Sequence, residues 1–528
     1  MKLVKSLMLG SAAGLIAMSG AQAADLPVKA KAVEYVRICS LYGAGFWYIP
    51  GTDTCMKIGG YLRVDTTFNG GIYNQPAWSG DLGQGNRFVD MIQSRSRMAL
   101  TVDTRTATEY GVVRTFMQGD FQFNNFGTTN PTSLATSGTP TALGGISGTL
   151  LNNDGGGYVA VEYVFIQFAG FTFGKSSSAY ATPWNGYPGN NSSFLLGGHD
   201  TVTGVNNIQY QAQFGNGVSA TIGLDDPTIF NRTALYNLST PVSATVPTPV
   251  GPNGLGVNAY GGFVVPDLVG NVRIDQAWGL FQVSGALHDV SASYNTLTFG
   301  GAPTTASILS GHPDSKVGGS VMAALQIKNI PTGPGDDIKF DASWAKGDTK
   351  NVIETSSTSP NFLMIGGVPG QFGSSGTIAW GPTTDGVFLP VAAGGDGRIH
   401  LTESFGFRGA FNHNWDPYWS TSLFGAMAWV RYDDTARAEY CAAIAGAVPG
   451  QGVSYSCNPN YNVSQLGVVT RWTPVKNLTF SAEAMWFHLH TGFSGFSTFS
   501  PGAPQPVQAW TFKNQDTLSL NVRVQRNF

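Results

Sequence analysis

The sequence has little charge, no long apolar run after its N-terminal region and few cysteines. Charged residues make up 12% of its 528 residues, about half the roughly 25% that is typical of soluble globular proteins. No later segment offers about 20 consecutive apolar residues, which excludes a membrane protein built from spanning helices. The net charge of −3 argues against a nucleic-acid partner, since nucleic-acid binders usually present a basic surface. These features, together with 69 glycines, favour hydrophobicity spread over alternate positions, as in membrane-spanning strands.

A signal peptide is predicted over residues 1–23. Lys2 and Lys5 precede a short apolar run from Leu7 to Met18, and Ala21-Gln22-Ala23 has the small-x-small pattern of a cleavage site. A retained membrane anchor is the alternative, but the apolar run is too short to span a bilayer stably. We therefore expect the protein to be exported and the mature chain to begin at Ala24.

The four cysteines form two equally spaced pairs, Cys39/Cys55 and Cys441/Cys457. In the oxidising compartment that export implies, each pair is expected to form a disulfide that closes a loop of about 15 residues. A zinc site would favour Cys-x-x-Cys spacing, and no histidine stands beside either pair.

Period-two alternation is the main structural signal. In residues 513–528, Leu518, Leu520 and Val522 alternate with polar residues such as Asn521 and Arg523, as expected for a wall between lipid and water. The same pattern predicts sixteen strands, at 56–69, 91–106, 109–124, 158–168, 170–178, 205–214, 217–226, 264–275, 278–293, 315–329, 336–347, 401–414, 418–433, 461–474, 477–491 and 513–528. Alternation is poor in the pair at 158–178.

The connections between these strands alternate strictly between long and short along the chain. A soluble sandwich gives no reason for this asymmetry, whereas an outer-membrane barrel has short periplasmic turns and long extracellular loops. The predicted fold is therefore an all-β, 16-stranded antiparallel transmembrane β-barrel. Residues 24–55 are expected to form a periplasmic segment with the first cysteine pair, and residues 56–528 to form the barrel.

Both ends of the mature chain resemble one protein family. The stretch ADLPVKAKAVEYVRICSLYGAGFWYIPGTDTCMKIGGYLR, from Ala24 to Arg63, is similar to the start of mature alphaproteobacterial porins, particularly the rhizobial type. The end, TLSLNVRVQRNF, resembles outer-membrane assembly signals, with Phe528 as the terminal aromatic residue. The resemblance implies a homotrimer in the bacterial outer membrane. Its partners would be outer-membrane lipid, lipopolysaccharide and the assembly machinery.

The resemblance also implies that the third long loop, near 179–204, folds inward to narrow the channel. This loop offers Asp200 as its one acid, so the charge of the constriction stays open. Independently, the polar faces of the first three predicted strands supply charged candidates. The predicted pore-lining and selectivity residues are Arg63, Arg95, Arg97, Arg114, Asp103, Asp120 and Asp200. Alternatively, the arginines pair with acids or loop carbonyls and stiffen the barrel.

The predicted function is passive diffusion of ions and small hydrophilic solutes through a polar lumen. No catalytic residue, cofactor or metal site is expected, and His488 and His490 fit an aromatic belt with Trp486 better than a shared metal. One rival is a barrel hydrolase, which would need a Ser/His or Asp/His constellation that the sequence does not assemble. Another is a substrate-specific channel such as a sugar porin, which the loop aromatics Tyr180, Trp184 and Tyr187 keep open.

Overall fold

The computed structural model describes most of the chain after its N-terminal region. The described residues are 37–69, 92–124, 158–184, 186–199, 203–228, 232–239, 256–298, 301–353, 361–368, 371–445, 450, 452–501 and 505–528. The predicted signal peptide and Asp200 lie outside these ranges.

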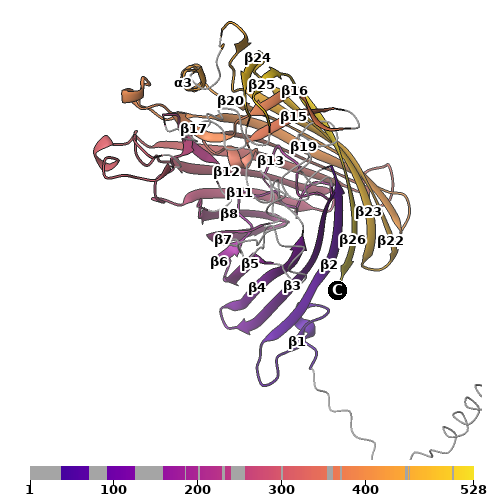
Figure 1. Ribbon diagram of the computed structural model, residues 1–528. Helices are drawn as coiled ribbons and strands as arrows, with labels where there is room; N and C mark the ends of the chain where they lie inside the picture. The colour runs from indigo at the N-terminus through magenta and orange to yellow at the C-terminus, as the bar shows by residue number, and fades with distance from the viewer. Residues whose placement is uncertain are drawn as a thin grey trace, which may run out of the picture.

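Sixteen antiparallel strands form one closed barrel (Figure 1), because the last strand pairs with the first. The barrel strands in chain order are β2 (Cys55–Phe68), β3 (Ile92–Thr108), β4 (Gly111–Asn124), β5 (Tyr158–Phe168), β6 (Phe171–Ser176), β7 (Val205–Gly215), β8 (Val218–Asp225), β11 (Asp267–Gln276), β12 (Gly279–Val290), β13 (Lys316–Lys328), β14 (Asp337–Lys346), β19 (Glu403–Asn414), β20 (Trp419–Arg431), β22 (Tyr461–Val475), β23 (Leu478–Thr491) and β26 (Gln515–Asn527). Each predicted strand corresponds to one of these sixteen, with ends that differ by a few residues. The predicted fold class is therefore confirmed.

The final strand shows why alternation identified the barrel. On β26, Leu518 and Leu520 are 61% and 42% exposed, whereas Asn521 and Arg523 are 3% and 7% exposed. The apolar row thus faces outward and the polar row faces the lumen, as a spanning strand requires. Alternation weakens at β5 because the register between β4 and β5 shifts at Gln118 and Gly119, and a bulge of this kind puts an extra residue into one strand.

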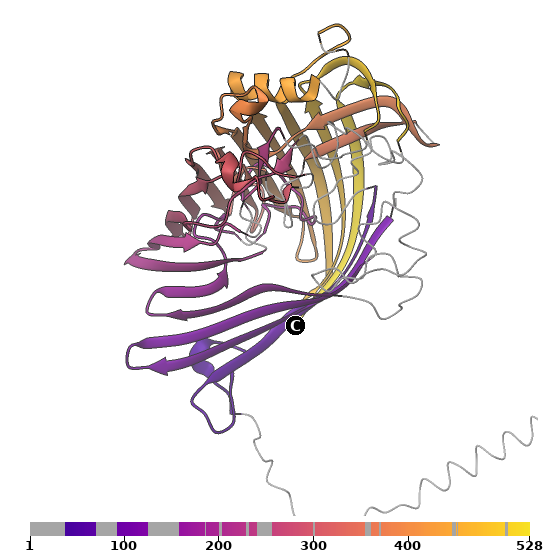
Figure 2. The same ribbon diagram turned by 60° about the vertical axis from the view of Figure 1, so that its left-hand side comes forward.

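The two ends of the barrel differ as predicted. Short turns join strand pairs at one end, and in one of them Asn216 and Gly217 have φ values of 50° and 73°. Asn-Gly is the preferred pair for a tight hairpin turn with positive φ at both positions. The long connections lie at the other end, which carries α3 (Asp434–Ala445) and the strand pair β24 (Ser494–Phe499) and β25 (Gln508–Phe512) (Figure 2).

Smaller elements occupy the long connections and the N-terminal segment. They are η1 (Ser40–Tyr42), β1 (Trp47–Tyr48), β9 (Ala234–Asn237), β10 (Val257–Asn258), η4 (Ile308–Ser310), η5 (Thr349–Asn351), β15 (Phe362–Val368), β16 (Gln371–Gly381), β17 (Thr384–Phe388), η6 (Val391–Ala393), β18 (His400–Leu401) and β21 (Tyr455–Ser456). None of the helices among the described residues is long and apolar enough to cross a bilayer.

Both predicted disulfides are present. Cys39–Cys55 fastens the N-terminal segment to the start of β2, and Cys441–Cys457 fastens α3 to the segment before β22. The N-terminal bridge is buried beside Phe46. The bridges therefore hold structure at opposite ends of the barrel.

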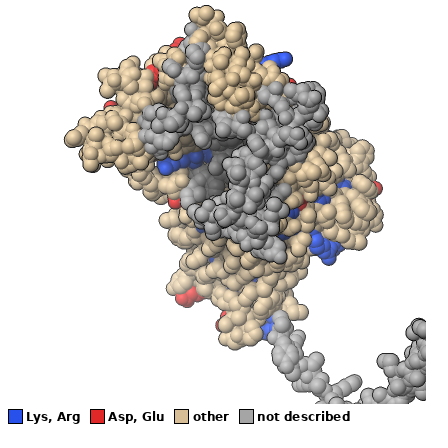
Figure 3. Space-filling model, viewed as in Figure 1, with Lys and Arg blue, Asp and Glu red and all other residues tan. Residues whose placement is uncertain are grey.

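The described residues on the face seen in Figure 3 are mostly uncharged. Trp415, Trp419 and Trp472 are exposed near the short turns, with Trp419 and Trp472 stacked across β20 and β22. Trp486 lies toward the long-loop end of β23 and is 38% exposed. These positions fit the predicted aromatic belts at the two membrane interfaces.

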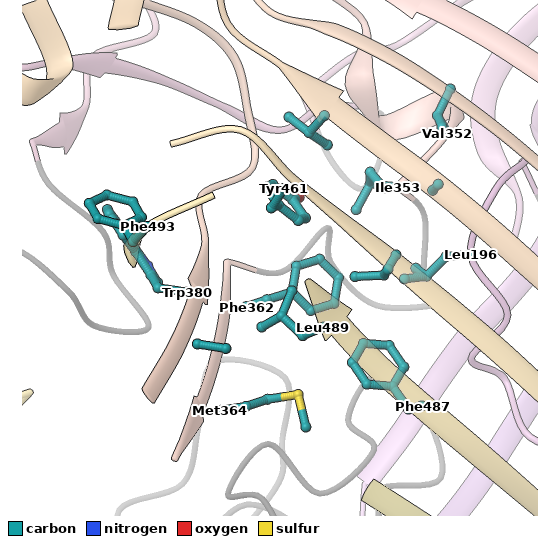
Figure 4. Close-up of a cluster of buried hydrophobic side chains, with 14 of the residues drawn as sticks. Leu196, Val352, Ile353, Phe362, Met364, Trp380, Tyr461, Phe487, Leu489 and Phe493 are labelled. Carbon is teal, nitrogen blue, oxygen red and sulfur yellow. The ribbon is translucent and has the colours of Figure 1, made fainter. Parts of the chain in front are cut away.

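The lumen is not polar all around, which corrects one expectation. On β20, β22 and β23 the inward rows include Phe424, Val463, Phe487 and Leu489, all 1% exposed or less. They pack against residues of the long loops, including Trp380, in a large buried apolar cluster (Figure 4). Because these loops cover this side of the wall, its inner face is apolar as well as its outer face.

Candidate functional site: the constriction of the barrel

The segment between β6 and β7 folds into the barrel and lies against its inner wall. We call residues 177–204 the constriction loop; Asn185 and residues 200–202 lie outside the described part. Phe194, Leu195 and Leu196 are fully buried and belong to the apolar cluster that includes inward residues of β20, β22 and β23. Apolar contact with the wall therefore holds the loop inside the lumen, as the family resemblance implied.

Hydrogen bonds fix the constriction loop along the wall. The Ser192 amide donates to Glu483 Oε1 at 3.3 Å, and the Leu196 amide donates to Gln465 Oε1 at 2.8 Å. Nearer its start, the Ala179 carbonyl accepts a 2.6 Å bond from Asn271 Nδ2. These anchors lie on β23, β22 and β11, so the loop contacts the wall over a wide arc.

Arg408 on β19 connects the constriction loop to the wall through an ion pair and hydrogen bonds. Its Nε lies 3.0 Å from Asp341 on β14, and both side chains are fully buried. Its other nitrogens donate to the carbonyls of Leu195 at 3.2 Å and His199 at 2.5 Å. A buried guanidinium shared between a carboxylate and two loop carbonyls is a strong, charge-assisted anchor.

The aromatic residues of the constriction loop are packed away from solvent. Tyr180, Trp184 and Tyr187 are 1%, 7% and 9% exposed, and the Tyr187 ring lies 5.2 Å from the Arg408 guanidinium carbon. An aromatic slide for sugars needs exposed ring faces. The structure does not place these three residues in such a slide.

A group of charged residues lines the wall formed by β26, β2 and β3. Asp65 accepts from Arg95 and from Arg523, each at 2.5 Å, and its side chain is fully buried. The Arg63 guanidinium donates to Gln525 at 2.8 Å. Adjacent inward positions on neighbouring strands thus bring these groups together, as the predicted polar faces required.

Arg97 continues this group onto β4 and β5. It lies 2.6 Å from Asp120 and 3.6 Å from Glu162, and it donates to Gln122 at 2.7 Å. The arginine predicted for pore lining is therefore also a member of an ion-pair network. Its ion pairs match the alternative interpretation, in which the arginines pair with acids, and its role in pore lining and selectivity stays a prediction.

Arg114 and Asp103 lie toward the short-turn end. Arg114 and Arg105 each reach Asp103 at 3.0 Å, and the two guanidiniums are 27% and 29% exposed. They border a cavity of about 530 Å³ whose wall includes Gln167 and Gln211. This end of the lumen is thus polar and open to water.

Two arginines facing the lumen contribute charge without an ion pair among the described residues. Arg63 is bonded to an amide, as above, and Arg471 on β22 donates to Ser422 Oγ at 2.7 Å and to the Gly189 carbonyl. The network of Arg95, Arg97 and Arg523 is largely compensated by Asp65, Asp120 and Glu162. Arg63 and Arg471 therefore differ from these arginines in having no carboxylate in direct contact among the described residues, although Asp65 attracts the first and Glu483 the second.

Another polar network lies on β11, β12 and the long connections. His288 Nδ1 is 2.7 Å from Asp267, and the Tyr260 hydroxyl lies 3.1 Å from His288 Nε2 and donates to Asp385 at 2.9 Å. Asp385 also accepts from the amide of Thr349 at 2.8 Å. These bonds hold the connection after β14 inside the mouth of the barrel.

Several residues of the constriction were not among the predicted pore-lining residues. Arg523, Asp341 and Gln465 stand on predicted strands, and their inward orientation was the available signal. Arg408 gives no comparable signal in the sequence, because it stands singly among Phe, Gly and Ala. Glu162 sits where β5 loses regular alternation, so its direction could not be read from the sequence.

The arrangement is a closed barrel with an inward loop and a charged wall, and the sequence matches the model of the porin subfamily over residues 25–521. The chain belongs to this family. The porin is 37% identical over 285 residues to Porin Omp2b of Brucella canis (strain ATCC 23365 / NCTC 10854 / RM-666), a match that covers 52% of this chain and 63% of that protein. A protein of the same name from Brucella abortus (strain 2308) is 36% identical over the same length. These matches cover less than two thirds of the relatives' own length.

The fold of the porin is also that of a solved outer-membrane protein. The outer membrane channel DcaP of Acinetobacter baumannii aligns with 91% of this chain and 99% of its own, at a TM-score of 0.51 and 14% identity. The likeness confirms the barrel fold. Together with the family match, it places the porin in the bacterial outer membrane, and the predicted alphaproteobacterial resemblance is confirmed by the Brucella proteins.

Proposed function

We propose that this porin is a passive diffusion channel for ions and small hydrophilic solutes. The observation that carries the proposal is a closed barrel whose lumen holds a charged wall on β26, β2, β3 and β4 and a fixed loop beside it. A charged constriction biases passage without any catalytic group. Planar-bilayer recordings of the purified porin test the proposal: ion-conducting steps support it, and a protein that inserts without conducting contradicts it.

We further propose that Arg63 contributes more to ion selectivity than Arg95 or Arg97. The Arg63 guanidinium forms no direct ion pair among the described residues, and Asp65, the carboxylate that attracts its charge, is shared with Arg95 and Arg523. Arg95 and Arg97, in contrast, each form a short ion pair. Arg63→Gln should lower the chloride-to-potassium permeability ratio about twofold to fivefold, since a unit charge about 4 Å from a passing ion is worth about 1 kcal/mol in water.

The matched control is Arg526→Gln. Arg526 is on the same strand pair but on the outer face, where it is exposed. Reversal potentials in asymmetric potassium chloride should shift for the first variant only. Equal shifts for both variants, or none for Arg63→Gln, would reject the assignment.

The porin is proposed to act as a channel and not as a hydrolase. The buried pair His288–Asp267 resembles part of a catalytic triad, but His288 Nε2 faces the hydroxyl of Tyr260, which is itself bonded to Asp385. Ester and peptide hydrolysis assays on the purified barrel should show no turnover above the detergent blank.

A homotrimer is the proposed oligomer, with β2–β4 as the contact face. Outward positions there combine the small residues Ser96 and Gly119 with large apolar side chains such as Met98 and Phe121, so the face is apolar and has recesses between its side chains. A Cβ atom added at Gly119 or at Gly285 on β12 meets no atom closer than 3.8 Å. Gly119→Trp should therefore abolish the trimer by occupying the interface, while Gly285→Trp should leave it intact, as judged by native mass spectrometry.

A further inference from the structure

A cluster of one histidine and three acids lies among the long loops, outside the lumen network. Asp396 and His400 come from the segment between β17 and β19, and Glu439 comes from α3. One nitrogen or oxygen of each of these three residues lies within 4.8 Å of the others. The cluster thus joins two connections that are far apart in the sequence.

The distance between His400 and Asp396 fits two ligands of one metal. Nε2 of His400 lies 3.2 Å from both carboxylate oxygens of Asp396. Two ligand atoms at 2.0–2.1 Å from a tetrahedral zinc ion are about 3.3–3.4 Å apart. The Arg398 amide donates to Asp396 Oδ1 at 2.8 Å, which fixes the carboxylate in this position.

Asp433 orients the imidazole of His400 from the other side. His400 Nδ1 lies 3.3 Å from Asp433 Oδ2. Metal-binding histidines usually donate their second ring N–H to a carboxylate, which fixes the tautomer and turns the other nitrogen toward the metal. Asp433 is itself held by a 2.7 Å bond from the Ala436 amide at the start of α3.

Glu439 supplies a buried oxygen. The residue is 7% exposed; its Oε1 accepts from the Asp396 amide at 2.9 Å, whereas Oε2 is buried without a hydrogen bond of good geometry. Burial raises the pKa of Glu439, although the amides of Asp396 and Leu389 act in the opposite direction. A buried carboxylate oxygen is costly unless a cation or donor satisfies it.

We propose that Asp396, His400 and Glu439 bind one divalent transition-metal ion of the zinc type, with Asp433 as the positioning residue of His400. An imidazole with carboxylates suits zinc, whereas calcium and magnesium prefer oxygen ligands alone. The Asp396 side chain is 38% exposed, so water can fill the fourth position. The bound ion fastens α3, already joined by a disulfide, to the loop at the mouth of the barrel.

The rival explanation is a protonated His400 bridging Asp396 and Asp433 with no metal. It accounts for both histidine contacts but gives Glu439 Oε2 no cation and no hydrogen bond of good geometry. The two explanations differ in one measurable property, which is saturable zinc binding.

Isothermal titration of Zn²⁺ into the detergent-folded porin tests the proposal. The parent carries His488→Asn and His490→Asn, which removes the outward pair of histidines on β23. It should bind one zinc per chain. Glu439→Gln and Asp396→Asn should each weaken binding at least about tenfold, and Asp433→Asn should weaken it about tenfold to a hundredfold while preserving helix capping.

Asp434→Asn is the matched control, because Asp434 begins the same helix but its side chain is 94% exposed and faces Arg437. Its zinc affinity should equal that of the parent. The shift in gel mobility on heating checks that every variant folds. Absence of saturable binding by the parent, undiminished affinity in Glu439→Gln and Asp396→Asn, or calcium binding as tight as zinc binding would overturn the proposal.

Discussion

Asp65 is the residue on which the charged wall depends most. Its buried carboxylate accepts from two guanidiniums, those of Arg95 on β3 and Arg523 on β26, at 2.5 Å each. Removing one member of a buried ion pair leaves its partner desolvated and uncompensated, which costs about 3–5 kcal/mol. Removing the Asp65 carboxylate would leave two buried guanidiniums, those of Arg95 and Arg523, without this partner.

Asp65→Asn should therefore lower the free energy of unfolding by about 3–5 kcal/mol in urea titrations of the vesicle-folded porin. Asp275→Asn is the comparison, since Asp275 also pairs with two cations but its side chain is 44% exposed. That change should cost about 1 kcal/mol or less. Similar losses for the two variants would show that burial of Asp65 does not govern the effect.

At the scale of elements, the barrel strands could be predicted from the sequence, whereas the packing of the long loops against the inner wall could not. Alternation found all sixteen barrel strands because lipid on one side and water or polar groups on the other impose opposite demands on successive residues. The same rule failed on β20, β22 and β23, where inward residues such as Phe424 and Phe487 are apolar and lie under the long loops. A sequence shows that both faces are apolar there but not which segment covers the inner one.

For the candidate site, the sequence predicts which way the charged side chains point but not which residues they contact. The inward directions of Arg63, Arg95, Arg97 and Arg114 follow from strand periodicity alone. The partners of these arginines depend on the register between strands and on the bulge at Glu162. Neither feature is visible in the sequence of a single strand. The anchoring of the constriction loop by Arg408 is a tertiary contact across more than two hundred residues.

Removing the anchors of the constriction loop should make the width of the pore fluctuate. Gln465→Ala with Glu483→Ala removes the hydrogen bonds to Leu196, Ser192 and Asn191, so the loop gains freedom to leave the wall. Single-channel recordings should show a more variable conductance with brief closures. Glu403→Gln, on the outward end of β19, should leave the current unchanged; current noise equal to that of the parent in the double variant would contradict the anchoring role.

The disulfide at α3 should act locally. Cys441→Ser with Cys457→Ser frees a loop closed across 16 positions, a constraint worth about 3 kcal/mol in chain entropy. We expect faster proteolysis of 434–457 in intact cells, with no change in the heat-dependent gel mobility of the barrel. Loss of the folded barrel band would instead assign the bridge a global role.

The whole molecule depends on the division between its outer and inner surfaces. Ile222 on β8 is 59% exposed and faces outward near the middle of its strand, and Gln211 on the neighbouring strand faces the polar cavity. Ile222→Arg should destabilise the porin in bilayers by about 2–4 kcal/mol, measured by urea unfolding. Gln211→Arg should change stability little, because its charge enters water; an equal loss would contradict the assigned faces.

The pairing of β2 with β26 has a consequence for how the barrel forms. Asp65 and Arg523 are 458 positions apart, so their contact closes nearly the longest loop available, and contacts of such high sequence separation slow folding. Every other neighbouring pair of strands can zip up along the chain before this one. Until then, the first and last strands present open edges that invite pairing with other chains. The slow step of biogenesis should therefore be the pairing of these two edge strands. A factor that protects the unfinished barrel from aggregation would act mainly at these edges.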